Sequence, residues 1–241
     1  MEITLRQVSK RYLLLDALKE VNATIEPGEI VAVLGLNGAG KTTLLQCLAG
    51  IVHPTSGEIL FDGERLHRDR MDLRRRFAFM PDMPFLFPDL TPIRHIGMVL
   101  KLYEKTYAGI EDRVVDILRG LDLLPLAESR IGTLSRGQAY KVGLAALMAA
   151  EPELLMLDEP FASGMDTQGM SAMKLFSREA ASRGKTVVYT TQILEVAEAF
   201  SHRVMILNRG EVFAFDRLER LLTMPGDDLS SVFKRLREQR S

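Results

Sequence analysis

The segment from residue 35 to residue 43 reads Gly-Leu-Asn-Gly-Ala-Gly-Lys-Thr-Thr, which has the spacing of a phosphate-binding loop. Glycines allow successive backbone N–H groups to curl around phosphate oxygens, and the N-terminus of the following helix adds its positive dipole end. Lys41 is placed to neutralise the terminal phosphates, so the pattern indicates a nucleoside triphosphate. The residues expected to bind it are Gly35, Asn37, Gly38, Ala39, Gly40, Lys41, Thr42 and Thr43.

The flanking sequence favours the strand and helix that such a loop requires. Residues 28–34 form a short apolar, β-branched stretch before the loop, and residues 43–49 after it are rich in helix formers. Cys47 falls on the expected helix, at a place where a small buried residue is expected. A redox or disulfide role for this cysteine is therefore not predicted.

Two carboxylates follow a second apolar stretch. Residues 154–157 read Leu-Leu-Met-Leu and lead into Asp158 and Glu159. Ligands of open α/β sheets bind beyond the carboxyl ends of the strands, so both acids are expected near the loop. Asp158 is placed to hold Mg²⁺ through water, with Thr42 as a further ligand, and Glu159 to polarise the attacking water. The alternative, two acids in a solvated turn, is weakened by the phosphate-binding loop.

A third motif lies between these two. Residues 134–138 read Leu-Ser-Arg-Gly-Gln and precede a long run of small and apolar residues. Ser135, with Gln138 three residues later, predicts a capping box that opens a helix. With this motif the chain resembles the ATP-binding cassette (ABC) family, whose signature Leu-Ser-X-Gly-Gln lies shortly before the second acidic strand. The resemblance implies that ATP held by one subunit is contacted by the signature of the other, here Ser135, Arg136, Gly137 and Gln138.

The resemblance covers nearly the whole chain and assigns further positions. Tyr12 lies 29 residues before Lys41, where the family carries an aromatic residue that stacks on adenine. The alternative for Tyr12 is a half-buried aromatic residue in a strand. Residues 163–166 match the segment that touches the opposite subunit, with Asp166 as its usual acid.

Two positions depart from the family pattern. Asp82 stands where the family usually has a glutamine that contacts Mg²⁺ and water; an acid can still reach Mg²⁺, but it brings a negative charge. Gln192 stands where the family usually has a histidine that hydrogen-bonds the terminal phosphate. Its amide can donate a hydrogen bond but cannot relay a proton, which leaves Glu159 as the candidate base. Arg136, at the variable signature position, either supplies positive charge across the dimer or is a solvated side chain.

The composition excludes several other classes of protein. The chain has 241 residues, 46% of them hydrophobic, which is enough for a full core. Its 31 basic and 32 acidic residues give no basic field for nucleic acid. No apolar run reaches the roughly 18 residues of a membrane helix, and the N-terminus does not read as a signal peptide. No metal spacing is found among His53, His67, His95 and His202.

The expected fold is α/β, a P-loop NTPase (RecA-like) core with an antiparallel β subdomain and an inserted helical subdomain. Residues 2–34 and 57–66 alternate apolar and polar side chains and are expected in the antiparallel layer, whereas residues 93–126 have helical spacing. The chain is expected to form a single ABC ATPase domain. Its parts are an ATP-binding core with the β layer (1–82 and 154–225), a helical subdomain with the signature (83–153) and a helical tail (226–241).

The resemblance implies the nucleotide-binding subunit of an ABC transporter, an ATPase that uses ATP and Mg²⁺. Its implied partners are a second copy, forming a closed dimer, and integral membrane subunits, which would place it peripherally at the cytoplasmic face of the cell membrane. Residues 81–92 and the tail resemble those of bacterial exporters. The alternatives are a soluble ABC ATPase for assembly or repair, and a slow or inactive ATP-gated module. The transported substrate is not written in this chain.

Two apolar segments have competing interpretations. Phe85, Leu86 and Phe87 offer an anchor for a short helix of a membrane subunit, or else they pack into the helical subdomain. The tail is basic and amphipathic, with Val232, Phe233 and Leu236 on one face. Packing on the chain's own core is favoured over a membrane contact.

Overall fold

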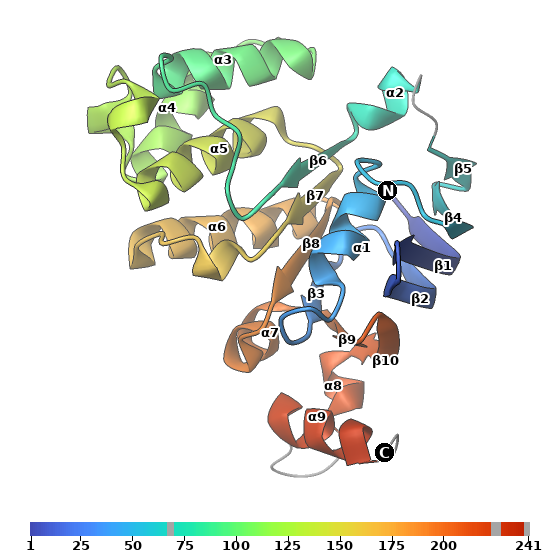
Figure 1. The fold of residues 1–241 in the computed structure, drawn as a ribbon. Helices are drawn as coiled ribbons and strands as arrows, with labels where there is room; N and C mark the ends of the chain where they lie inside the picture. Colours follow the sequence, from blue (N-terminus) through green and yellow to red (C-terminus); the bar gives the residue numbers. More distant parts are fainter. Residues whose placement is uncertain (67–69, 223–227, 239–241) are drawn as a thin grey trace.

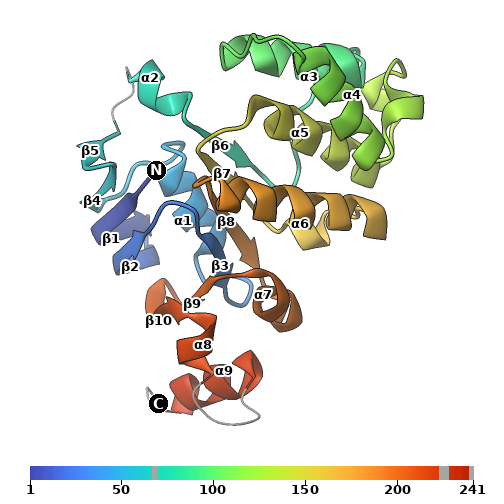
Figure 2. The same cartoon turned by 180° about the vertical axis from the view of Figure 1, so that it is seen from behind.

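Two β-sheets and the helices that cover them form the protein in the computed structural model, which describes residues 1–66, 70–222 and 228–238 (Figures 1 and 2). The parallel and antiparallel strands lie in separate sheets, and a layer of helices stands apart from the smaller sheet. This mixed architecture confirms the expected α/β class. The side chains of 233 and 235–238 lie outside the described residues, and these include Phe233 and Leu236 of the predicted apolar face.

The larger sheet supplies the edge at which the chemistry is expected. Its strands, among the described residues, are β3 (Ile30–Leu34), β6 (Phe77–Met80), β7 (Leu154–Leu157), β8 (Thr186–Thr191), β9 (Arg203–Asn208) and β10 (Glu211–Arg217). They are ordered β10–β9–β3–β8–β7–β6, with β10 antiparallel to β9 and the other neighbours parallel. β3 and β7 are buried along their whole length, which explains their continuous apolar sequences.

The smaller sheet is antiparallel and lacks one strand that the sequence assigned to it. In the described part of the chain it contains β1 (Ile3–Tyr12), β2 (Leu15–Ile25), β4 (Ser56–Phe61) and β5 (Glu64–Arg65), in the order β2–β1–β4–β5. The expectation that all of residues 2–34 belong to this layer is wrong for β3, which is central to the larger sheet. The physical reason is visible in the sequence, because the alternation of the first strands gives way in β3 to five consecutive buried apolar residues.

Strand β3 contributes to two separate cores. Val31 and Val33 point toward the core shared with the smaller sheet and with α1 (Lys41–Leu48), whereas Ile30, Ala32 and Leu34 belong to the core on the opposite face. This division follows from the two-residue period of a strand. The second core also receives side chains from α6 (Thr167–Ser182) and α7 (Leu194–Phe200). The phosphate-binding loop therefore follows directly on a strand that is packed against a core on each of its two faces.

The predicted helices between residues 93 and 126 are confirmed. They are α3 (Pro92–Leu102) and α4 (Ile110–Gly120), and both pack against α5 (Arg136–Ala150), as Figure 1 shows. Thr91 caps α3 through a hydrogen bond from the Arg94 backbone N–H, 3.5 Å. The shorter helical segments are α2 (Met71–Arg74), α8 (Leu218–Leu221) and the 3₁₀ turns Leu124–Leu126, Ile131–Thr133 and Pro160–Ala162.

The chain ends in α9 (Leu229–Glu238), which packs beside α7. Leu229 and Val232 are buried in the second core, and the Leu229 backbone N–H donates a hydrogen bond to the Glu198 carboxylate. Packing on the chain's own core, as predicted for Val232, is confirmed. Of the predicted tail, residues 226–227 and 239–241 lie outside the described residues. Across the part of the chain that is described, no helix has the length and apolar character needed to span a bilayer.

Cys47, on α1, should be chemically inert in the folded protein. Burial raises the pKa of its thiol to about 11, although Lys10 opposes the shift. A raised pKa keeps the thiol protonated at pH 8, where only about one molecule in a thousand carries the reactive thiolate. We expect iodoacetamide labelling of the native protein at pH 8 to be at least about 100-fold slower than labelling of the denatured chain, measured by mass spectrometry. Equal rates in the two states would contradict this burial.

Candidate functional site

The predicted loop and acidic residues meet at the carboxyl edge of the larger sheet. Strands β3, β6 and β7 end there, and the segments that follow them border one cavity of about 510 Å³. This edge is the usual ligand-binding position of an open α/β sheet. The cavity is lined by Tyr12, Leu15, Asp16, Ala17, Asn37, Gly38, Ala39, Gly40, Lys41, Thr42, Thr43, Asp82, Asp158 and Glu159.

The phosphate-binding loop needs glycine at its last position for a steric reason. Gly40 has φ +105° and caps the N-terminus of α1. A Cβ atom at Gly40 would lie 2.4 Å from the carbonyl oxygen of Ala17, closer than non-bonded atoms can approach. Gly38 also has a positive φ, +78°, but its surroundings are open. The loop is therefore held in shape by contact with β2, which the motif alone does not reveal.

Lys41 joins the loop to the acidic strand. Its Nζ donates to the carbonyl oxygens of Gly35, 2.9 Å, and Leu36, 3.3 Å, and forms an ion pair with Glu159 Oε1 at 3.0 Å. The side chains of Lys41 and Glu159 are only 6% and 18% exposed. A buried ammonium without a counter-charge is strongly unfavourable, so this ion pair stabilises both groups. Phosphate oxygens would compete with Glu159 for the same ammonium group.

Asp158 is the most enclosed acid of the site. It is 3% exposed, and its Oδ1 accepts hydrogen bonds from the hydroxyls of Thr190, 2.7 Å, and Thr42, 3.2 Å. Its backbone N–H donates to the carbonyl oxygen of Met80, 2.9 Å, which ties the end of β7 to the end of β6. Asp158 thus presents a fixed carboxylate beside the first helical hydroxyl after the loop. Carboxylate and hydroxyl oxygens are the ligands that Mg²⁺ prefers.

Glu159 has a strained backbone. Its φ and ψ are +45° and +48°, the left-handed region that non-glycine residues seldom adopt. The Glu159 backbone N–H donates to Thr190 Oγ1, 2.8 Å, and this bond helps to hold the unusual conformation. The turn directs the carboxylate toward Lys41. Backbone strain of this kind is frequent at functional sites.

Thr190 is the functional residue that the sequence reasoning missed. Its hydroxyl contacts both acids, donating to Asp158 and accepting from Glu159. The register of the sheet explains this, because Leu157 pairs with Tyr189 and the next residues of the two strands are therefore side by side. The only sequence signal is a polar residue near the end of an otherwise apolar strand. That signal requires knowledge of which strands are neighbours.

Tyr12 and three residues of β2 also line the cavity. Tyr12 ends β1 and is 39% exposed, and Lys10 Nζ lies 4.9 Å from the centroid of its ring. The ring is thus accessible from the cavity rather than enclosed in the core. Leu15, Asp16 and Ala17 also line the cavity, and the sequence analysis did not select them. They belong to β2, which pairs with the end of β1.

The two departures from the family pattern have different positions. Asp82 is exposed and lines the cavity, together with Asp158 and Glu159. Gln192, which follows β8, is not among the described residues that border this cavity. It lines a separate hollow of about 80 Å³ beside Gly35 and Leu36. The structure therefore brings Asp82 to the site but leaves Gln192 at its margin.

The signature residues form a helix terminus away from this cavity. The predicted capping box is confirmed, since the Gln138 backbone N–H donates to Ser135 Oγ, 3.2 Å, and the Ser135 backbone N–H donates to Gln138 Oε1, 2.9 Å. Ser135 and Arg136 are exposed, and no residue from 135 to 138 is among the described residues lining the cavity. A helix N-terminus open to solvent can receive an anion from another molecule.

Asp166 connects the start of α6 to α5, the helix that begins with the signature residues. Asp166 caps α6 by accepting from the Gly169 backbone N–H, 2.7 Å, and it pairs with the buried Lys141 of α5 at 2.9 Å. A Cβ atom at Gly137 would lie 2.1 Å from the Gly164 carbonyl oxygen, so only glycine allows this approach. The segment 163–166 therefore packs directly against the start of α5.

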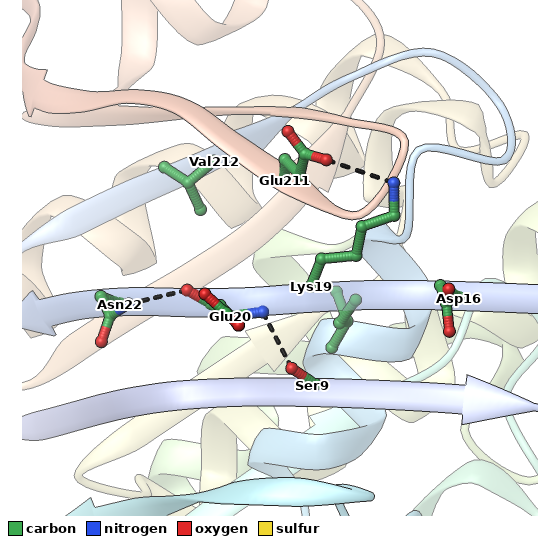
Figure 3. A pocket seen from close by; sticks show the side chains of 8 residues that line it. Ser9, Asp16, Lys19, Glu20, Asn22, Glu211 and Val212 are labelled. Carbon is green, nitrogen blue, oxygen red and sulfur yellow. Dashed lines mark hydrogen bonds and ion pairs between the residues drawn. The ribbon is translucent and has the colours of Figure 1, made fainter.

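A second hollow, of about 680 Å³, lies on the β layer between β2 and β10 (Figure 3). Its polar groups bond to one another: Lys19 pairs with Glu211 at 3.2 Å, and the Glu20 backbone N–H donates to Ser9 Oγ, 2.9 Å. Asn22 donates to the Glu20 carbonyl oxygen, 2.7 Å. These contacts stabilise the hairpin beside the site, and the hollow offers no convergent charge for a ligand.

Fold and site together define a P-loop ATPase. Residues 18–162, more than half of the chain, match the family model described as ABC transporter. The chain therefore belongs to the ABC transporter family, as an ATP-binding subunit that hydrolyses ATP. The recognition made from the motifs is confirmed.

Relatives with similar sequences carry transporter names. Nod factor export ATP-binding protein I of Burkholderia pseudomallei is 34% identical over 215 residues, which cover 88% of this chain and 69% of that protein. The ABC-type transporter ATP-binding protein EcsA of Bacillus subtilis is 31% identical over 219 residues, covering 91% of this chain and 88% of that protein.

Solved structures agree on the fold. An ATP-binding subunit of an ABC transporter superposes with a TM-score of 0.92 at 30% identity and covers 98% of this chain and 100% of that one. A dimeric ATP-binding cassette in a post-hydrolysis state, bound to ADP and Pi, superposes with a TM-score of 0.80 at 29% identity and covers 90% of this chain and 98% of that one.

Thr190→Val should impair the site without changing side-chain shape. The substitution removes the hydroxyl that holds Asp158 and the Glu159 turn, so we expect steady-state ATP hydrolysis to fall about 10-fold or more and the free energy of unfolding to fall by about 1–3 kcal/mol. Thr190→Ser keeps both hydrogen bonds and should remain near wild type. Wild-type turnover in Thr190→Val would exclude this positioning role.

Proposed function

We propose that this protein is the peripheral ATPase subunit of an exporter, acting as a homodimer bound to separate integral membrane subunits at the cytoplasmic face of the cell membrane. The observation that carries the catalytic part is the Lys41–Glu159 ion pair in a cavity that also contains Asp158. It brings a phosphate-binding cation, a candidate base and a metal-binding acid within one site. Relatives named for export support the direction of transport.

The loop and the acids have separate roles in this proposal. The loop N–H groups and Lys41 bind the β- and γ-phosphates, Tyr12 stacks on the adenine, and Glu159 orients and deprotonates the attacking water. The proposed metal is Mg²⁺, held by Thr42, Asp158 and Asp82, and it would neutralise charge on the transferred phosphoryl group. The all-oxygen donor set and the Thr42–Asp158 contact of 3.2 Å support this choice. Gln192 would donate a hydrogen bond to the terminal phosphate.

The remaining motif residues fit a second subunit. The N-terminus of α5, which carries Ser135, Gly137 and Gln138, is open to solvent at Ser135 and Arg136 and lies away from this chain's own cavity. A helix N-terminus favours an anion, and we assign to it the terminal phosphate of ATP bound by the partner subunit. Arg136 adds a cation on the same surface. Asp166, fixed by Lys141, lies on the surface that would meet the partner.

Lys41 and Glu159 variants should fail at different steps. Lys41→Ala removes the phosphate-binding cation and leaves Glu159 unpaired, so we expect loss of ATP binding at millimolar concentration. Glu159→Gln retains the loop and should bind ATP, stop turnover and accumulate an ATP-bound dimer. Equilibrium binding, hydrolysis and size-exclusion chromatography measure these outcomes. The control is Glu111→Gln, an exposed acid of α4, and unchanged turnover in Glu159→Gln would remove Glu159 from its role.

The loop between β6 and α3 is the proposed binding site for the membrane subunit. Phe85 is 97% exposed and Phe87 is 55% exposed, whereas Leu86 packs against the core. The alternative, that all three residues pack into the helical layer, therefore fails for Phe85. Two exposed phenylalanines on one short loop are typical of a binding surface.

Phe85→Asp combined with Phe87→Asp should separate assembly from nucleotide binding. Charges on this loop would prevent an apolar helix from docking, so we expect loss of co-purification with the membrane subunit while ATP affinity is retained. Leu175→Asp, which alters an exposed leucine of α6, is the matched control and should assemble normally. If the double variant assembles with wild-type affinity, the binding site for the membrane subunit lies elsewhere.

A further inference from the structure

Tyr140 carries a buried hydroxyl that the mechanism above does not use. Its side chain is fully buried within α5, two residues after Gln138 of the signature. Among the described residues, the phenol oxygen has no hydrogen-bond partner. A buried polar group without a partner costs free energy, and such groups are rare in folded proteins. A hydrogen bond formed in another state of the protein would remove this cost.

The packing of α5 shows which segment this tyrosine faces. Gly143 lies three residues after Tyr140 and therefore on the same face of the helix. A Cβ atom at Gly143 would lie 3.1 Å from Pro84 Cβ and 3.2 Å from Met80 Cε. Met80 and Pro84 bracket Asp82 in the chain. That face of α5 thus packs on the segment that carries Asp82 to the cavity.

The electrostatics agree with this placement. The pKa of Tyr140 is raised, first by burial and then by the negative charges of Asp158 and Asp82. Asp158 Oδ1 already accepts two hydrogen bonds from threonine hydroxyls, whereas Asp82 is exposed on the loop that follows β6.

We propose that Tyr140 is a positioning residue for Asp82, and that its O–H donates a hydrogen bond to the Asp82 carboxylate in the nucleotide-bound, closed state. The two groups are chemically complementary, because an ionised carboxylate only accepts and the phenol donates. The bond would fix Asp82 for its part in the reaction. It would also link the signature helix, which contains Tyr140, to the loop that carries Phe85. This inference rests on the proposed role of Asp82 at the reaction centre.

Tyr140→Phe tests the bond because it removes only the oxygen. Since the hydroxyl has no partner among the described residues, we expect the melting temperature of the chain, measured without nucleotide, to be unchanged or higher. Turnover of MgATP by the full chain should fall about 10-fold or more, the low end of what a hydrogen bond to a charged group is worth, with the KM for MgATP unchanged. Loss of turnover without loss of stability is not expected from a residue that only packs.

Tyr103→Phe is the matched control. The Tyr103 hydroxyl has a partner, since it donates to the Phe77 carbonyl oxygen at 3.1 Å. Removal of that oxygen should lower the melting temperature and leave turnover near wild type. The two tyrosines should therefore respond in opposite ways.

A double variant identifies the partner of the phenol. If Tyr140 acts through Asp82, Tyr140→Phe should have no further effect on turnover in an Asp82→Ala background. Wild-type turnover in Tyr140→Phe, beside an impaired Asp82→Ala, would overturn the inference and leave the proposed function intact. Additive losses, or a drop in melting temperature like that of Tyr103→Phe, would also overturn it. Wild-type turnover in Asp82→Ala would instead remove Asp82 from the proposed site.

Discussion

A buried ammonium requires a counter-charge, and in this protein Glu159 supplies it to Lys41. This ion pair connects the phosphate-binding loop to the acids that follow β7. Lys41 is paired with Glu159 at 3.0 Å, and its hydrogen bonds go to the loop's own carbonyl oxygens. The same pair holds the candidate base close to the phosphate position. Phosphate oxygens of a nucleotide would compete with Glu159 for the Lys41 ammonium. In the proposed mechanism, nucleotide binding would thereby free the Glu159 carboxylate to act as the base.

The larger sheet positions Asp158 and Glu159, and the hydroxyl of Thr190 contributes to the position of both. Thr190 contacts Asp158 and the strained turn at Glu159, while Met80 bonds the backbone of Asp158 from the other side. Three neighbouring strands, β6, β7 and β8, thereby fix the acids. Preorganisation of this kind lowers the cost of stabilising charge during phosphoryl transfer. The loop with Asp82 and Phe85, by contrast, is exposed.

Much of the fold could be predicted because its signals are local. The helical spacing after residue 92 and the capping box at Ser135 depend on residues three or four positions apart, and both are present in the structure. The assignment of β3 to the antiparallel layer failed for the opposite reason. Whether an apolar strand pairs with its sequence neighbour or enters a different sheet is decided by long-range contacts, here with β8 and β9.

By itself, the sequence determined the chemistry of the protein, because the loop Gly35–Thr43, the acids Asp158 and Glu159 and the signature at Ser135 are fixed spacings along the chain. Only the tertiary structure decided which residues share a cavity. It brought Asp82 to the site, left Gln192 in a neighbouring hollow and added Thr190 through the register of two strands. It also left Tyr140 buried without a partner. Register, burial and hydrogen-bond satisfaction arise from packing between distant segments, and no local pattern encodes them.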